Sequence, residues 1–231
     1  MKQLTILILI SAGILCSCEE TDPEISVVDY LVIGDINATV LMPGPNTIES
    51  SGNPLLWTAS ILDLDLDNDG TDDFRIVYSS KFSPMETYTK AWSIKLLNDG
   101  AGILCVDSPE SPWYARYPEI LVIGDTLKLT AKWRSEPLSP MITPPPAPVV
   151  QPPALDTSLS FLLATGYSML FFDQYFRPYW VNEIYGYWIG ATSKYIGVML
   201  EKENGVYLGW IKVSVINSGI VVHEMGSKKL N

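Results

Sequence analysis

The sequence has little histidine, little cysteine and no concentration of positive charge. Its 231 residues include one histidine and three cysteines, and 26 acidic residues outnumber 15 basic ones, for a formal net charge of −11. A Ser-His-Asp triad would have to use His223, and three cysteines cannot form a complete set of disulfides. Because the basic residues form no cluster, the charge argues against nucleic acid as a partner.

The sequence also lacks the motifs of several enzyme classes. It contains no G-x-S-x-G elbow and no glycine-rich phosphate loop. His223 lies in the run G-I-V-V-H-E-M, where alternation puts it on one face with Val221 and Met225 and predicts a strand histidine satisfied by packing or by water. We therefore expect a protein that is not an enzyme. The alternative is a carbohydrate-active hydrolase, because paired carboxylates meet in space and leave no sequence pattern; its candidates are Asp173, Glu183 and Glu201.

The N-terminal segment reads M-K-Q-L-T-I-L-I-L-I-S-A-G-I-L-C-S-C-E-E. Its apolar run has about 12 residues, whereas a membrane-spanning helix needs about 20, so residues 1–17 are predicted to be a cleaved export signal. Leu15, Cys16 and Ser17 before Cys18 resemble the lipobox of bacterial lipoproteins, which implies that Cys18 carries the lipid. An ordinary signal peptide without a lipid is the alternative.

Residues 18–24 begin the mature chain as a lipidated acidic tether with Glu19 and Glu20. This start is similar to lipoproteins of the Bacteroidota type, in which such acidic residues direct the protein to the outer leaflet of the outer membrane. The resemblance implies a lipid-anchored protein on the cell surface, held there by two or three acyl chains; a plain flexible tether is the alternative. The remaining cysteine, Cys105, lies in G-I-L-C-V and is expected to be buried.

Apolar, β-branched and aromatic residues recur at every second position, which predicts an all-β protein. At the C-terminal end, the runs 195–202, 206–216 and 220–225 are joined by E-N-G and N-S-G, so a three-stranded antiparallel meander is expected there. Further strands are expected at residues 55–62, 74–80, 89–97, 127–133 and 158–164. The segment K-L-L-N-D-G-A-G-I-L-C-V predicts a hairpin that turns at residues 98–100.

Residues 25–231 are predicted to form one antiparallel β-sandwich, jelly-roll-like in type, because a single sheet would leave a hydrophobic face in water. A closed barrel is the alternative. Eight of the 17 prolines lie in residues 137–153, which are expected to form a long extended loop within the sandwich, or else a linker between two domains. The words L-V-I-G-D occur at 31–35 and 121–125, through an old duplication or by chance.

The most informative stretch is L-D-L-D-L-D-N-D-G-T-D-D-F, in which six of the 26 acidic residues lie within positions 63–73. Gly70 sets the register D-x-D-x-D-G-x-x-D. Calcium takes six to eight oxygen ligands, and a tight loop with glycine at its sixth place can turn alternate side chains inward. Without a cation these carboxylates would repel one another. The spacing predicts a calcium site, with a backbone carbonyl from Thr71 and carboxylates from Asp65, Asp67, Asp69 and Asp73.

This loop is not an EF-hand, because its twelfth place is Ile76 and both flanks read as strands. It resembles the calcium loops between strands of integrin-type repeats and of many secreted bacterial β-proteins, which end in an aspartate and an apolar residue, here Asp73 and Phe74. Zinc is disfavoured because the loop has no histidine or cysteine. A solvated acidic turn is the alternative, and Asp63 and Asp72 are expected to be only that. The calcium is expected to be structural.

Aromatic residues are concentrated in F-F-D-Q-Y-F-R-P-Y-W-V-N-E-I-Y-G-Y-W-I-G. Flat exposed rings bind the faces of sugars, so this segment is a candidate glycan-binding face. Alternatively, the rings fill the sandwich core, brace the proline-rich loop or dock another surface protein. The candidate ligand-binding residues are Tyr179, Trp180, Tyr185, Tyr187 and Trp188.

The lipobox, the loop D-L-D-N-D-G-T-D-D-F and the closing Y-I-G-V-M-L-E-K-E-N-G-V-Y-L-G-W-I-K-V-S-V together resemble a group of secreted bacterial proteins. In that group an Asp-rich loop is followed by an I-G-V strand, a turn and a Y-G-W-I strand, whereas here Leu208 separates Tyr207 from Gly209. The group has no established activity. We therefore expect a surface lipoprotein of the outer membrane with one structural calcium, acting as a binding or structural module with glycans as candidate ligands.

Overall fold

The computed structural model describes residues 30–35, 38–49, 58–83, 87–107, 116–136, 160–172, 175 and 178–230. The export signal, Cys18 with its tether and the proline-rich segment 137–153 lie outside these ranges, so the expectations for them stay predictions. The described residues contain β-strands and no helix. They accordingly include no helical segment with the length and hydropathy needed to cross a bilayer.

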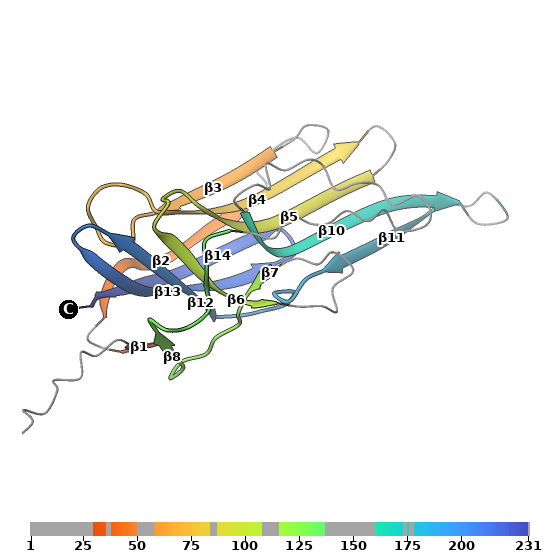
Figure 1. Cartoon of the computed structure of the whole chain (residues 1–231). Coiled ribbons are helices and arrows are strands. Elements are labelled where there is room, and N and C mark those ends of the chain that lie inside the picture. The colour runs from red at the N-terminus through yellow and green to blue at the C-terminus, as the bar shows by residue number, and fades with distance from the viewer. Residues whose placement is uncertain are drawn as a thin grey trace, which may run out of the picture.

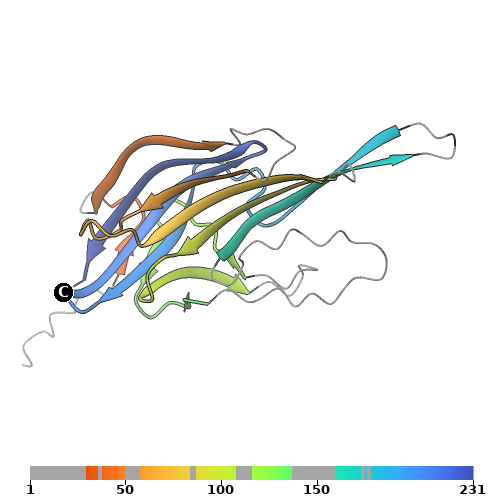
Figure 2. The same cartoon turned by 90° about the horizontal axis from the view of Figure 1, so that it is seen from above.

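Two open antiparallel sheets stack on each other, and a small third sheet lies beside them (Figure 1). The five-stranded sheet has the order β11 (Pro178–Tyr185), β10 (Ser160–Phe172), β5 (Thr87–Leu96), β4 (Phe74–Ser83), β3 (Thr58–Leu64). The seven-stranded sheet has the order β2 (Thr39–Glu49), β14 (Gly219–Lys229), β13 (Gly205–Ile216), β12 (Lys194–Lys202), β6 (Ala101–Asp107), β7 (Arg116–Pro118), with β9 (Trp133–Arg134) also paired to β6. The two-stranded sheet joins β1 (Tyr30–Val32) to β8 (Thr126–Lys128). Seen from above, β10 and β11 project beyond the other strands (Figure 2).

The predicted antiparallel β-sandwich is confirmed, and so is its C-terminal meander of β12, β13 and β14. The jelly-roll connectivity is not confirmed. Consecutive strands are neighbours in β3-β4-β5 and in β12-β13-β14. In the second set the two-residue connections 203–204 and 217–218, each followed by glycine, favour hairpins.

The main core lies between the two large sheets. Phe74, Ile76 and Trp92 face it from the five-stranded sheet, and Val198 and Ile211 face it from the seven-stranded sheet, all at most 1% exposed. Each such side chain stabilises the fold by about 1.5–3 kcal/mol through burial. Cys105 lies in the same cluster, as expected.

A second, smaller core covers the other face of the seven-stranded sheet. Leu31 of β1 and Leu127 of β8 pack there against Tyr195 and Trp210. Strand β12 is therefore covered on both faces, which is why buried residues run through it without alternation. Gly197 allows this approach, because a Cβ at that position would lie 2.8 Å from Leu127 Cδ2.

The two L-V-I-G-D segments form matching turns that touch. In each, the aspartate N–H donates to the valine carbonyl three residues back, at 3.0 Å for Asp35 and 3.1 Å for Asp125. Gly34 and Gly124 provide the positive φ that such turns need, 83° and 91°. The turns are joined because the Ile33 N–H donates to the Asp125 carbonyl at 2.9 Å. The repeated sequence L-V-I-G-D therefore forms the same turn conformation at both places.

Two sequence-based expectations about strands are wrong. The turn at residues 98–100 does not make a hairpin, because β5 pairs within the five-stranded sheet and β6 within the seven-stranded one, so this turn crosses between the sheets. Residues 127–133 are not one strand, since β8 ends at Lys128 and β9 begins at Trp133. Strand β2 was not among the expected strands. It contains Pro43 and Pro45 and lies at a sheet edge, where proline is tolerated.

Candidate metal site

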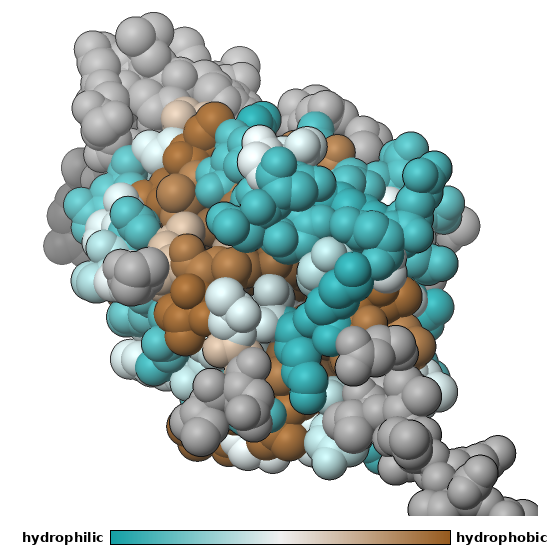
Figure 3. All heavy atoms as spheres, turned by 90° about the vertical axis from the view of Figure 1, so that its left-hand side faces the viewer, coloured by the Kyte–Doolittle hydropathy of each residue, from teal (hydrophilic) through white to brown (hydrophobic). Residues whose placement is uncertain are grey.

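The loop of residues 65–73, called the Asp loop below, connects β3 to β4 at one end of the sandwich. In Figure 1 it is the gold loop at the left, beside the blue hairpin between β12 and β13. Figure 3 shows this end face on, with hydrophilic residues gathered over its upper part. The turn at residues 98–100 reaches the same place, because the Asn98 side chain donates to Asp73 Oδ1 at 3.3 Å. The Asp loop therefore lies where the two sheets meet.

The first half of the Asp loop is wound around the carboxylate of Asp65. That carboxylate accepts hydrogen bonds from the N–H groups of Asn68 at 2.7 Å, Asp69 at 3.3 Å and Gly70 at 2.7 Å. The winding requires left-handed backbone at Asn68 (φ 60°) and Gly70 (φ 90°), which asparagine and glycine tolerate best. The alternation of aspartate with small or polar residues thus has a direct conformational role.

The second half of the Asp loop is held by Asp73, whose side chain is fully buried. Its Oδ2 accepts a hydrogen bond from the Leu66 N–H at 2.9 Å. Its backbone joins both neighbouring strands, since its N–H donates to the Leu64 carbonyl and its carbonyl accepts from the Leu97 N–H, each at 2.8 Å. Leu66 is itself fully buried, so the loop is anchored from both of its ends.

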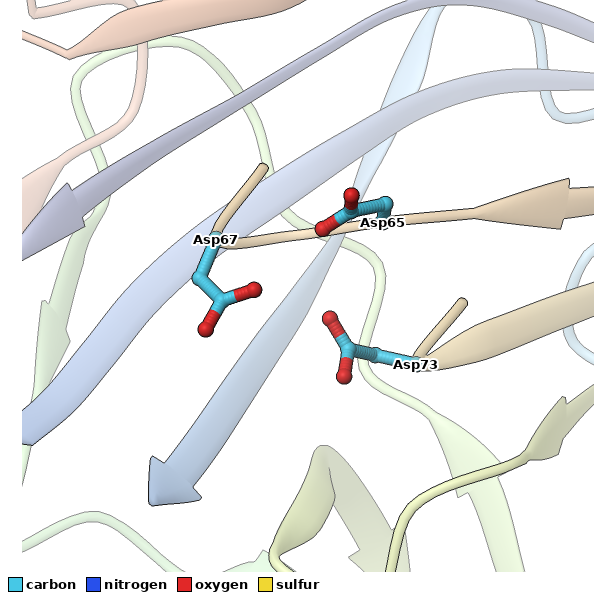
Figure 4. Close-up of side chains that lie close together, drawn as sticks. All are labelled: Asp65, Asp67 and Asp73. Atoms are coloured by element: carbon cyan, nitrogen blue, oxygen red, sulfur yellow. The ribbon is translucent and has the colours of Figure 1, made fainter. Parts of the chain in front are cut away.

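Three of the predicted ligands converge. Asp65, Asp67 and Asp73 each offer one carboxylate oxygen, and these oxygens all lie within 4.8 Å of one another. Figure 4 shows the carboxylates of Asp67 and Asp73 turned toward each other, with that of Asp65 beside them. Such a group could hold a metal ion, and carboxylate oxygens are ligands of hard cations.

Asp69 does not join this group, and the backbone carbonyl of Thr71 stays a predicted ligand. One oxygen of Asp69 accepts a hydrogen bond from the Thr71 N–H at 2.8 Å, and its other oxygen contacts Lys202 at 2.7 Å. The side chain of Asp69 is 41% exposed, whereas that of Asp67 is 1% exposed. The loop therefore separates an inner group of three carboxylates from an outer one at its rim.

Lys202, at the end of β12, was missed by the sequence reasoning. Its Nζ lies 2.9 Å from Asp67 Oδ2, 2.7 Å from Asp69 Oδ2 and 3.3 Å from Asp73 Oδ1. It donates a hydrogen bond to Asp67 Oδ1 at 3.0 Å. Asp67 Oδ2 is buried and accepts no hydrogen bond of good geometry. Its contact with Lys202 is therefore an ion pair that leaves the hydrogen-bonding capacity of this oxygen unsatisfied. No local sequence pattern predicts a contact between the Asp loop and a lysine so distant in the chain.

The electrostatics of the site follow from burial and from the lysine. Burial raises the pKa of Asp73, and the charge of Asp67 adds to this, although the Leu66 N–H and Lys202 oppose it. At the rim, the hydrogen bond from Lys202 lowers the pKa of Asp69. Desolvation alone would lower the pKa of Lys202, but Asp69, Asp67 and Asp73 together outweigh it and raise that pKa. The site therefore strongly favours a positive charge at its centre.

The other two aspartates of the acidic stretch lie outside the site. Asp63, on β3, forms a two-pronged ion pair with Arg75 directly opposite on β4, at 2.6 Å and 2.9 Å. It is therefore a cross-strand partner and not a solvated turn residue. Asp72 is exposed, as expected.

The candidate glycan face is only partly described. Tyr179, Trp180 and Tyr185 lie on β11, but their side chains are outside the described part of the structure. Tyr187 is 49% exposed. The prediction that Trp188 offers an exposed ring to a ligand is wrong. Trp188 is fully buried, and its Nε1–H donates to the Pro118 carbonyl at 2.8 Å.

His223 forms a hydrogen bond that the sequence did not predict. Its Nε2 lies 2.7 Å from Ser214 Oγ on the neighbouring strand, and that Oγ also accepts the Ser193 N–H at 2.8 Å. The register of β14 shifts at His223, so the buried Met225 shares the core with Val222 and the expected alternation is broken. The contact between His223 and Ser214 therefore links β14 to β13.

Of the candidate carboxylates of a hydrolase, only that of Glu201 lies in the described part of the structure. Glu201 is exposed on β12, directly before Lys202. Asp173 and the side chain of Glu183 lie outside the described residues. The hydrolase alternative therefore stays a prediction.

Comparisons with known proteins add no family to this geometry. No protein-family model, no curated protein and no solved structure matches the chain. The resemblances carried by the lipobox and by the Asp loop stay predictions. The functional inference therefore rests on the contacts of the site itself.

Proposed function

We propose that the protein is an exported lipoprotein of the outer membrane, anchored through Cys18 and facing outward, whose Asp loop binds one structural calcium ion. It acts as a binding or structural module and not as an enzyme. The observation that supports the metal most directly is the convergence of Asp65, Asp67 and Asp73 on a position that already stabilises a cation. The expectation of export supports calcium, because extracellular calcium is abundant enough to fill even a weak site.

Calcium suits the donors better than other common metals do. The inner group offers only oxygen, and calcium accepts six to eight oxygens in flexible geometry, with water or backbone carbonyls completing the set. Magnesium requires a tighter octahedron at about 2.0–2.1 Å. Zinc and copper prefer nitrogen or sulfur, and residues 65–73 contain no histidine or cysteine.

A bound ion would act on stability because of where the loop lies. Asp73 is hydrogen-bonded to Leu66 within the loop and to Asn98 in the turn that crosses between the sheets. A metal shared by Asp65, Asp67 and Asp73 would tie these segments together. Binding to the folded state alone stabilises it by about 2.7 kcal/mol at a hundredfold excess over the dissociation constant.

Thermal unfolding of the mature chain from Cys18 onward, in detergent, tests this proposal. We expect saturating calcium to raise the melting temperature by about 5–10 °C over chelator, from about 2.7 kcal/mol and about 2–4 °C per kcal/mol for a chain of this size. Asp67→Asn removes an inner ligand and should abolish most of the shift. Asp63→Asn, the matched control from the same acidic stretch, should retain it. Equal melting temperatures in calcium and chelator would contradict the proposal.

A further inference from the structure

A lysine ammonium group lies in the middle of the acidic cluster. Lys202 is contributed by the seven-stranded sheet, whereas the cluster is on the connection between two strands of the five-stranded sheet. Its Nζ lies within 3.3 Å of oxygens from Asp67, Asp69 and Asp73. The side chain of Lys202 is 16% exposed. The single positive charge of Lys202 therefore contacts three carboxylates in a largely buried position.

The ammonium group and a metal ion would compete for the same oxygens. A calcium ion bound by the inner group must lie about 2.3–2.6 Å from its oxygens. Lys202 Nζ contacts oxygens of two inner ligands, Asp67 Oδ2 at 2.9 Å and Asp73 Oδ1 at 3.3 Å. A divalent ion at that distance would repel the ammonium group. Simultaneous binding of both cations to these oxygens is therefore unfavourable.

We propose that Lys202 is an internal cation that holds the Asp loop closed in the absence of metal, and that a divalent metal binds by displacing its ammonium group. This inference rests on the proposed function, because it describes how the same site is filled. Asp67 Oδ2 supports it: this buried oxygen lies 2.9 Å from Lys202 Nζ but accepts no hydrogen bond of good geometry, so the ammonium group satisfies it less completely than a metal would.

The surroundings of Lys202 permit the exchange. The residue ends β12 beside the turn at residues 203–204, and its long stem can move the ammonium group without moving the strand. Asp69 lies at the rim, is 41% exposed and already pairs with the lysine. Asp69 therefore receives the displaced ammonium group, which explains why the third aspartate of the motif does not join the inner group.

Replacement of Lys202 by methionine in the mature chain tests the displacement. Calcium affinity is measured by calorimetry, and the melting temperature is measured in chelator and in saturating calcium. If the lysine occupies the site in nine-tenths of metal-free molecules, its removal raises the apparent affinity by about tenfold. We also expect Lys202→Met to melt at a lower temperature than wild type in chelator and to recover in calcium. Lys194→Met, at the other end of β12, is the matched control and should change neither quantity.

A second measurement uses the wild-type protein, so that it remains decisive if Lys202→Met fails to fold. Lysine acylation followed by mass spectrometry should show faster modification of Lys202 in calcium than in chelator, with Lys194 unchanged. Calcium binding with no change in Lys202 reactivity, or with wild-type affinity in a folded Lys202→Met, overturns the displacement and leaves the calcium site standing. No calcium binding by either protein overturns both proposals.

Discussion

The acidic stretch of residues 62–74 contains two arrangements of carboxylate and cation that differ in balance and in burial. On the paired strands, Asp63 meets Arg75 one to one, and the two side chains are 27% and 35% exposed. In the Asp loop, one ammonium group from Lys202 meets carboxylates of Asp67, Asp69 and Asp73, and the side chains of Asp67 and Asp73 are almost fully buried.

The comparison teaches that the number of acidic residues does not by itself define a cation site. Asp63 satisfies its charge locally, because a cross-strand arginine matches a carboxylate with two parallel hydrogen bonds. The Asp loop retains an excess of buried negative charge even with its lysine in place, and such an excess is costly unless a cation balances it. Excess charge together with burial distinguishes the site from the surface pair.

The largest effect expected in this stretch comes from an apolar residue of the loop. Leu66 is fully buried, and its Cδ1 lies so close to Gly209 of β13 that a Cβ there would be 2.6 Å away. We expect Leu66→Ala to lower the free energy of unfolding by about 2–5 kcal/mol through the cavity it leaves. Urea unfolding measures this. Ile61→Ala on β3, where the side chain is 52% exposed, is the control and should cost about 0.5 kcal/mol or less.

An intermediate effect is expected at Asp73. Asp73→Ala leaves the buried Leu66 N–H without its acceptor, so we expect a loss of about 1–3 kcal/mol in the free energy of unfolding, measured in chelator. Asp73→Asn keeps an acceptor oxygen and should lose less in chelator, yet it should lose the calcium-dependent stabilisation. Similar stability of the alanine and asparagine variants would show that this hydrogen bond does not hold the loop.

The smallest effect is expected at the surface pair. Asp63→Asn should lower the free energy of unfolding by about 1 kcal/mol or less, because exposed ion pairs contribute little. The hydrogen bond from Arg75 holds the pKa of Asp63 below its ordinary value of 3.8. The contribution is therefore complete above that pH and is lost as the pH falls through the lower, folded-state value. Urea unfolding of both proteins from pH 7 to pH 3 should show a gap that narrows only at the acidic end.

Much of the fold was predictable because it depends on local periodicity. Strand alternation and the turns before Gly205 and Gly219 identified β12, β13 and β14, whose pairing needs only short connections. The turn at residues 98–100 has the same residue types, Asn, Asp and Gly, but it crosses between the sheets. A turn sequence does not show whether the two strands that flank it pair with each other. Trp188 likewise looked like the aromatic residues around it, and only packing placed it in the core.

The Asp loop follows from local sequence alone. Asp65, Asp67 and Asp73 are so near in the chain that one tight turn around Gly70 brings their carboxylates together. The cation that faces these carboxylates depends instead on the packing of the two sheets. Lys202 lies more than a hundred positions along the chain, and it reaches the loop because the two sheets stack with these ends together. Local spacing cannot encode such a contact, since it depends on how whole sheets pack.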